Sequence, residues 1–177
     1  MSGNRHRLMR RSERQVTDPK EIQGILAESP VVSLAIHDEP APYVVPLFFG
    51  HEDGRLYVHS ALSGTKIRLL HADPRVGFTA WTPAEIVEGG DACSFSARAR
   101  SVAGTGVARI VEDEKERMHG LDLIMRHSTG REAGFAYDRA SVSRTLVIAV
   151  DIVAILGKRT ENRPESPRAR GAGQQVR

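Results

Sequence analysis

The sequence has one cysteine, few aromatic residues and no long apolar run. The single cysteine, Cys93, excludes an internal disulfide and argues against a cysteine-ligated metal site. We therefore expect no bound metal and a cytoplasmic location. No run approaches the roughly 18 apolar residues that a membrane helix needs, so we expect no membrane partner. No apolar stretch follows the basic N-terminus, so we also expect no secretory signal.

Charge is distributed unevenly along the 177 residues. The segments 1–20 and 158–177 each carry a net charge of +4, whereas residues 21–157 carry −5. A nucleic-acid-binding domain concentrates basic residues on its folded surface. Here the basic residues lie at the two ends of an acidic core, which argues against a nucleic acid as the partner.

Composition divides the chain into three segments. We expect a flexible basic N-terminus over residues 1–16, one folded domain over 17–158 and a disordered basic tail over 159–177. The tail contains one branched apolar residue, Val176, and cannot bury enough surface to offset the entropy of ordering. The middle segment is long enough for one sizeable hydrophobic core.

A strong helix start signal stands at Asp18-Pro19-Lys20-Glu21. Asp at the N-cap, Pro at the first helical position and Glu at the third are all favoured there. The helix ends by Ser29-Pro30, and its buried stripe is expected to hold Ile22, Ile25 and Leu26.

Strands dominate the rest of the chain. We expect them at 31–36, 43–49, 55–59, 75–81, 93–111 and 145–155, with a hairpin turn at 51–54, a loop at 83–91 and helices at 63–70 and 113–125. The 93–111 segment is either one long strand or a pair bent at Gly104 and Gly106. Because the βαβ alternation of a dinucleotide-binding sheet is missing, this order favours a mainly β (α+β) antiparallel barrel with peripheral helices.

The most informative stretch joins the strand that ends at His59 to the following helix. The first N–H groups of a helix are free donors, and the helix dipole makes this end positive. The hydroxyls of Ser60, Ser63 and Thr65 lie close in sequence, and Lys66 falls in the first turn. The stretch is either a phosphate site or an ordinary capped helix with a surface lysine.

Pro46 interrupts a predicted strand. Proline removes a ladder donor, which places this strand at a sheet edge or at a bulge. Unpaired backbone groups beside Pro46 could bond the polar edge of a flat heterocycle, with apolar cover from Val44, Val45 and Leu47. The alternative is a plain edge strand.

Five segments occur in an order that resembles a known family. They are Arg10-Arg11, Pro42-Tyr43-Val44-Val45-Pro46-Leu47, Leu56-Tyr57-Val58-His59-Ser60-Ala61-x-x-Gly64-x-Lys66, Ser101-Val102-x-Gly104-x-Gly106 and Gly157-Lys158. Together they resemble the pyridoxamine-phosphate-oxidase-like flavoproteins, in the subgroup related to nitroimidazole-resistance proteins. The resemblance implies a Greek-key split β-barrel and a homodimer that binds FMN at its interface.

The same resemblance implies roles for individual residues. The isoalloxazine ring would contact Val44, Val45 and Pro46. The ribityl phosphate or the ring edge would lie near His59, Ser60, Gly64, Thr65 and Lys66, with His59 close to the reactive centre. Ser101 and its neighbours would complete the site, from the same or the partner subunit. Arg100 would either meet a phosphate across the dimer or belong to a solvated stripe with Arg98.

Three features depart from the family pattern. Phe48 stands where the subgroup often has Asn, and Ala99 stands where it often has an aromatic residue. The C-terminal tail lacks the arginine-rich motif ending in an aromatic residue that true pyridoxamine-phosphate oxidases carry. This difference argues against pyridoxamine phosphate as the substrate.

The resemblance predicts an FMN-dependent oxidoreductase. Electrons would pass from a reduced nicotinamide through FMN to a small organic acceptor such as a nitroaromatic compound. The alternative is a non-catalytic protein of the same fold that binds flavin, haem or a deazaflavin. A nucleic-acid-associated protein that uses its basic ends is the third hypothesis.

Overall fold

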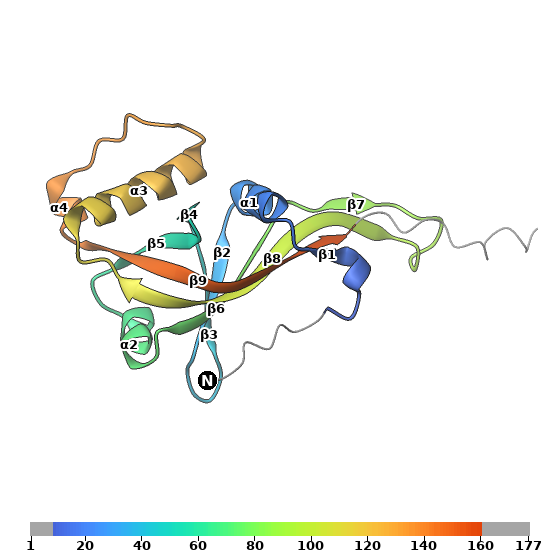
Figure 1. Cartoon of the computed structure of the whole chain (residues 1–177), viewed down its shortest axis with the longest axis horizontal. Helices are drawn as coiled ribbons and strands as arrows, with labels where there is room; N and C mark the ends of the chain where they lie inside the picture. The colour runs from blue at the N-terminus through green and yellow to red at the C-terminus, as the bar shows by residue number, and fades with distance from the viewer. Residues whose placement is uncertain (1–8, 161–177) are drawn as a thin grey trace, which may run out of the picture.

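A computed structural model describes residues 9–160 and contains one nine-stranded antiparallel sheet with helices around it (Figure 1). A 3-10 turn, Ser12–Arg14, precedes the first strand. The strands are β1 Gln15–Val16, β2 Val32–Ile36, β3 Tyr43–Leu47, β4 Phe49–Glu52, β5 Arg55–Ala61, β6 Arg75–Trp81, β7 Glu85–Val87, β8 Ser96–Ile110 and β9 Thr145–Thr160. The helices are α1 Pro19–Glu28, α2 Thr65–Ala72, α3 Glu114–Thr129 and α4 Arg139–Val142. None of the helices within residues 9–160 is long and apolar enough to cross a membrane.

The strand order closes the sheet on itself. The main path runs β3-β2-β6-β8-β9-β5-β4, with β1 added on β9 and β7 on β8. Its two terminal strands, β3 and β4, are separated in sequence only by Phe48, so the two ends of the sheet must meet. Within residues 9–160 no pairing joins β3 to β4, so the barrel is not fully closed, and the expected split β-barrel with peripheral helices is confirmed.

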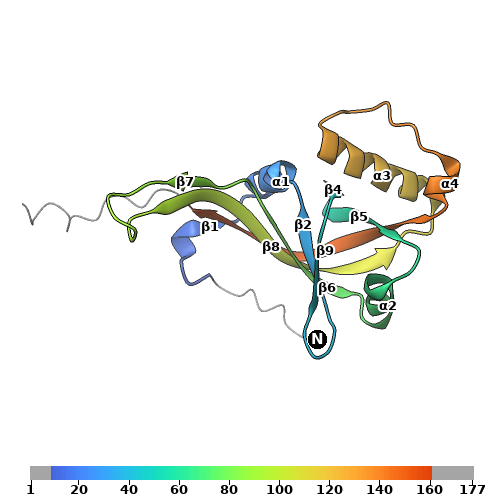
Figure 2. The ribbon, with the colours of Figure 1, turned by 180° about the vertical axis from the view of Figure 1, so that it is seen from behind.

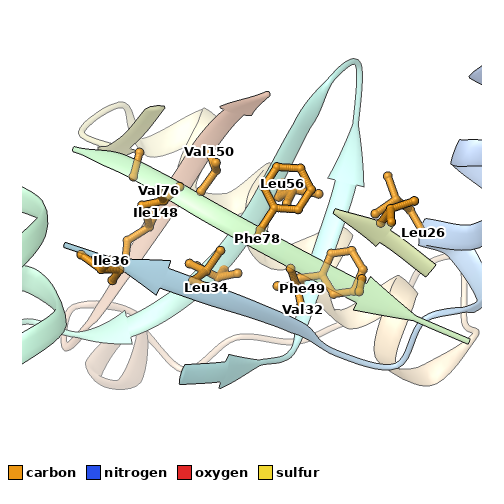
Figure 3. Close-up of a cluster of buried hydrophobic side chains, with 14 of the residues drawn as sticks. Leu26, Val32, Leu34, Ile36, Phe49, Leu56, Val76, Phe78, Ile148 and Val150 are labelled. Atoms are coloured by element: carbon orange, nitrogen blue, oxygen red, sulfur yellow. The ribbon is translucent and has the colours of Figure 1, made fainter. Parts of the chain in front are cut away.

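The main core fills the inside of this barrel. Strand residues such as Leu34, Phe78 and Ile148 point inward and are buried (Figure 3). The apolar stripes of α1 and α2 join the same cluster. A second, smaller cluster lies between α3 and the outward face of the sheet, around Tyr57, Val147 and Ala149. Burial of these two apolar clusters is the main term that holds the helices in place.

Helix α1 has the predicted boundaries for the predicted reasons. The Asp18 carboxylate accepts a hydrogen bond from the Lys20 N–H at 2.9 Å, and Pro19 occupies the first turn. The helix ends at Glu28, and Ser29 is its C-cap. The expected apolar stripe of this helix is buried in the main core and consists of Ile22, Ile25 and Leu26.

Several other boundaries differ from the sequence expectation. The predicted strand 43–49 is broken at Phe48 into β3 and β4, because the chain passes there from one end of the sheet to the other. The expected loop 83–91 contains β7, and the helix expected over 113–125 continues to Thr129. Segment 96–110 is one continuous strand with a register shift between Thr105 and Gly106. At Gly104 a β-carbon would collide with the Phe78 ring, which explains the glycine.

The ends of the folded segment also extend further than predicted. Gln15 and Val16, which we placed in the flexible N-terminus, form β1 and pair with Lys158 and Gly157 of β9. Val16 is buried, and this burial explains why the segment packs. Strand β9 includes Arg159 and Thr160, which we placed in the tail. The rest of the predicted tail and residues 1–8 lie outside the described residues.

The outward face of the sheet divides into two regions. Helix α3 packs over β4, β5 and part of β9, as both views show (Figures 1 and 2). The outward face of β3, β2, β6 and β8, with the middle of β9, instead carries many small or apolar side chains, with polar ones such as Thr79 and Thr105 among them. Four large apolar side chains on these strands remain exposed, namely Val44, Trp81, Val107 and Val153.

Candidate functional site

The N-terminus of α2 presents free backbone donors. β5 ends at Ala61 and α2 begins at Thr65, with Gly64 as the N-cap residue. Gly64 has φ +134°, a conformation that glycine adopts without strain. No described side chain caps this helix, and its first turn contains no acidic residue. The first N–H groups of α2 are therefore available to a ligand.

Two side chains beside this helix end have shifted pKa values. Partial burial lowers the pKa of Lys66. Partial burial also lowers the pKa of His59, and the positive charge of Lys66 lowers it further. Among the ion pairs of the described residues, none involves Lys66. The site therefore holds a partly desolvated cation without a carboxylate partner.

These features suit a phosphate group. Backbone N–H donors at a helix start and an adjacent ammonium group are the groups that bind a dianion. Ser63 and Thr65 are exposed at the same helix end, and Ser60 is half-buried on β5. A bound anion would offset the desolvation that lowers the pKa of Lys66.

β3 is an edge strand, which is one of the two positions that its proline predicted. Its side chains alternate: Tyr43, Val45 and Leu47 pack against the main core, whereas Val44 and Pro46 are exposed. The expectation that all of Val44, Val45 and Pro46 face a ligand thus needs one change. The Val45 side chain points at the core, so only its backbone is available to a ligand.

The short connection from β3 to β4 brings the end of β3 close to the end of β5. Phe49 pairs with Val58, which directly precedes His59. Phe48 directly precedes Phe49 in the chain and is 56% exposed. Because consecutive Cα atoms are 3.8 Å apart, Pro46 lies within about 12 Å of Phe49 along the chain. The fold thus brings Pro46 and His59 into the same region of the barrel.

Arg100 and Ser101 lie far from the end of β5 and from α2 in one chain. Ser60 pairs with Leu146 on β9, whereas Ser101 pairs with Lys158, twelve residues further along. At about 3.3 Å per residue this separation is roughly 40 Å along the strand. The fold therefore does not bring Ser101 to α2 within one protomer.

Arg100 and Ser101 also point to opposite faces of β8. The Arg100 guanidinium forms an ion pair with Glu28 of α1. It helps to line a cavity of about 470 Å³ that also contains Arg98, Arg159 and Glu85. Ser101 lies on the outward face in register with Trp81. The alternation of strand residues makes this separation unavoidable.

Sequence reasoning missed two surface features. The first is the outward sheet face with exposed Val44, Trp81, Val107 and Val153. Its signal was present, because β8 and β9 carry small or apolar residues at positions facing both sides. The second is a cavity of about 450 Å³ lined by the N-terminal segment and the end of β9, which are far apart in sequence.

Two known proteins are similar to this chain in sequence. A candidate 5-nitroimidazole antibiotic resistance protein from Bacteroides thetaiotaomicron is 33% identical, with a TM-score of 0.71 over 81% of this chain and 85% of that chain. An uncharacterised protein of Rhizobium meliloti is 34% identical over 62 residues, which is 35% of this chain. This chain covers only 40% of that curated relative.

Two more distant structures share the fold alone. A flavocytochrome from Azotobacter vinelandii is 21% identical, with a TM-score of 0.77 over 93% of this chain and 77% of that chain. An FAD- and haem-binding protein from Mycobacterium smegmatis is 20% identical, with a TM-score of 0.75 over 88% and 77% of the two chains.

The family model described as pyridoxamine 5'-phosphate oxidase matches residues 18–159. Because this match spans most of the chain, the chain belongs to the pyridoxamine 5'-phosphate oxidase family.

Proposed function

We propose that this protein is an FMN-dependent oxidoreductase that passes electrons from a reduced nicotinamide to a small organic acceptor such as a nitroaromatic compound. The observation that carries the proposal is the uncapped N-terminus of α2 beside Lys66, a partly buried cation without a described carboxylate partner. Such a site fits the phosphate of FMN, and His59 at the end of β5 lies close enough to Lys66 to feel its charge.

The residues at the N-terminus of α2, at the end of β5 and on β3 have separate roles in this proposal. The first N–H groups of α2, the hydroxyl of Thr65 and the ammonium group of Lys66 hold the phosphate, and Gly64 lets the chain approach it closely. Ser60 lies at the end of β5, on the same strand as His59. Val44 and Pro46 provide apolar contact for the flavin ring from β3. When bound, the flavin supplies the hydride and electron transfer chemistry.

His59 is suited to act on the acceptor rather than on the phosphate. Burial and the nearby Lys66 charge lower its pKa, so its imidazole is neutral at pH 7. A neutral imidazole has one ring N–H donor and one ring nitrogen acceptor. His59 can therefore orient an acceptor by a hydrogen bond and exchange one proton with it.

We also propose a homodimer formed through the outward sheet face. Val44, Trp81, Val107 and Val153 are exposed there, and Trp81 is 65% accessible. Between these side chains the same face of the sheet contains small residues, so another surface can approach it closely. They include Ala35, Gly77, Ala103 and Ala154. A two-fold partner would cover this face and could bring Ser101 of the partner subunit to the flavin, which the roughly 40 Å along β9 prevents within one chain.

A non-catalytic binding protein is the second candidate. The similar structures named for FAD, haem and flavocytochrome function support a binding role for FAD or haem as well as FMN. In addition, a catalytic acid or base is usually oriented by a hydrogen-bonded partner. His59 has no such partner among the described residues. A deazaflavin would bind through the same phosphate site.

The test is to purify the protein and identify its bound molecule by absorbance and mass spectrometry. The proposal expects flavin bands near about 370 and 450 nm, the mass of FMN, and oxidation of a reduced nicotinamide that depends on a nitro acceptor. A flavin without turnover would favour the binding protein. A colourless protein that fails to bind added FMN would overturn both flavin readings, and a Soret band would assign haem.

A further inference from the structure

Phe48 is an exposed aromatic residue at the junction of β3 and β4 that the proposed function does not use. It is 56% exposed, whereas the next residue, Phe49, is fully buried in the main core. No aromatic or cation–π contact within residues 9–160 involves Phe48. A phenylalanine ring that meets no other ring or cation of the chain offers its apolar area to a ligand.

Phe48 and His59 lie on the same side of the sheet. Gly50 pairs with Tyr57 beneath α3, and a β-carbon on Gly50 would lie 2.6 Å from the Leu123 β-carbon (Figure 1). Because side chains alternate along a strand, residues two positions away share a side. Phe48 is two residues before Gly50. His59 is two residues after Tyr57, and because the strands run antiparallel, both side chains emerge from beneath α3 in the same direction.

The two side chains are also close to each other. Phe49 pairs with Val58, and paired Cα atoms of antiparallel strands are about 4.5 to 5.5 Å apart. With 3.8 Å for each of the two steps along the chain, the Cα atoms of Phe48 and His59 are at most about 13 Å apart. A small ring that packs on Phe48 is thus within reach of the imidazole of His59.

The groups near His59 favour an uncharged acceptor. Leu62, three residues further along the chain, is 51% exposed and adds apolar surface. Lys66 is the one charged group of the described residues that shifts the pKa of His59. In the proposed site the charge of Lys66 is offset by the phosphate, whose second negative charge disfavours another anion nearby.

We propose that Phe48 selects the acceptor: an uncharged aromatic acceptor packs its ring on Phe48 while His59 forms a hydrogen bond with its polar group. This inference rests on the proposed function for the flavin and for the role of His59. The proposed dimer face consists of rows on β3, β2, β6, β8 and β9, and Phe48 lies outside these strands, so the dimer does not require it. Packing of two aromatic rings adds to the gain from burying their apolar area.

The direct test is titration calorimetry of the flavin-loaded protein with three probes. Benzamide and acetamide share an uncharged amide group, and benzoate has the ring with a negative charge in place of the amide. We expect benzamide to bind at least about tenfold more tightly than either of the others, because only benzamide combines a ring with an uncharged polar group. Equal binding of benzamide and acetamide, or tighter binding of benzoate, would overturn the proposal.

Three variants locate the selection. Phe48→Ala should weaken benzamide binding about tenfold, and Phe48→Tyr should retain it because the ring remains. Phe95→Ala is the matched control, because Phe95 is similarly exposed, at 50%, but directly precedes β8, far from α2. Full benzamide affinity in Phe48→Ala, or an equal loss in Phe95→Ala, would refute selection by Phe48.

FMN affinity and oligomeric state distinguish this role from two others. Phe48→Ala should keep both unchanged. A loss of FMN affinity would place Phe48 against the flavin, and a loss of the dimer would place it in the subunit interface; either result would overturn the proposal.

Steady-state kinetics gives a second readout. Phe48→Ala should raise the KM for nitrobenzene about tenfold and leave the rate with ferricyanide, which has no aromatic ring, unchanged. An equal loss with both acceptors would contradict selection of the ring. If the protein binds no FMN, the proposed function and this inference fail together, whereas normal FMN binding without a preference for benzamide refutes this inference alone.

Discussion

The N-termini of α1 and α2 are built from different residues and differ in whether their backbone donors are capped by side chains. At α1 the Asp18 carboxylate accepts the N–H of Lys20, and Glu21 adds a second negative charge to the first turn. At α2 the N-cap is Gly64, without a described side-chain cap and without an acidic residue in the first turn. The first helix caps its own N-terminus, whereas the first N–H donors of the second have no described side-chain cap and its dipole is not offset by an acidic residue in the first turn.

The lysines of these two helices occupy equivalent positions. Lys20 and Lys66 are each the second residue of their helix. Lys20 is exposed, whereas Lys66 is half-buried and its pKa is lowered by that burial. Burial of a charge without a partner is unfavourable. This difference between the two helices supports the proposal that α2 binds an anion.

The largest expected effect is a difference in FMN binding between variants of the two lysines. Lys66→Gln should weaken FMN binding about 10- to 100-fold, because it removes a charged hydrogen-bond donor from the phosphate. Lys20→Gln should leave FMN binding unchanged, because α1 is closed by its own carboxylate. Fluorescence titration of the apoprotein with FMN measures both. Equal loss in the two variants would erase the difference between the helices.

Making α2 resemble α1 gives the next largest effect. Thr65→Glu places a carboxylate in the first turn of α2, where it should stabilise the flavin-free protein by about 0.5 kcal/mol through the helix dipole. The same charge should repel the phosphate and weaken FMN binding. Urea unfolding and FMN titration should therefore change in opposite directions. A variant that is less stable but binds FMN normally would show that phosphate does not bind here.

Removing the cap of α1 is the converse experiment. Asp18→Ala should destabilise the protein by about 1 kcal/mol, the usual contribution of an N-cap side chain. FMN affinity should not change, because the α1 N-terminus takes no part in binding. Chemical denaturation and FMN titration of one preparation give both values. A marked loss of FMN affinity at unchanged stability would contradict this division of roles.

The smallest expected effect concerns the contacts of α1 with β4 and α3 at low pH. His51 Nδ1 lies 3.1 Å from Gln23 Oε1 of α1, and His127 Nε2 donates to the Ser29 carbonyl at 2.7 Å. Burial and the charge of His127 lower the pKa of His51, while Glu52 opposes them.

Because this pKa is lower in the folded state, the unfolded chain binds the extra proton more readily. The stability that His51 contributes is thus present above about pH 6.5 and is lost as the pH falls towards its folded-state pKa. Denaturation of the apoprotein at pH 7.5 and 5.5 should show this loss, and His51→Gln should reduce it. An unchanged pH dependence in the variant would assign the loss to other groups.

Much of the fold could be predicted because local signals agreed with the packing. Asp18-Pro19 fixed the start of α1, and Pro46 placed β3 at an edge. The break at Phe48 could not be predicted, because it arises where a closed sheet brings β3 and β4 to its two ends. Strand β1 was missed because the burial of Val16 depends on Gly157, far away in sequence.

The candidate site was predictable only in part. The helix start at Thr65 and the position of Lys66 in its first turn follow from local sequence. The inward direction of Val45 and the ion pair between Arg100 and Glu28 depend on sheet register and on α1. The cavity of about 450 Å³ joins Arg10, Arg11 and Arg14 to Lys158, and only the pairing of β1 with β9 brings these residues together.

The most direct test compares FMN with riboflavin, which has the same ring and lacks the phosphate. Both are titrated into the apoprotein and into the Lys66→Gln variant. If the N-terminus of α2 holds the phosphate, FMN should bind the wild-type protein at least about 100-fold more tightly than riboflavin, and most of that difference should disappear in the variant. Equal affinities for FMN and riboflavin, or a preference that the variant retains in full, would contradict the account.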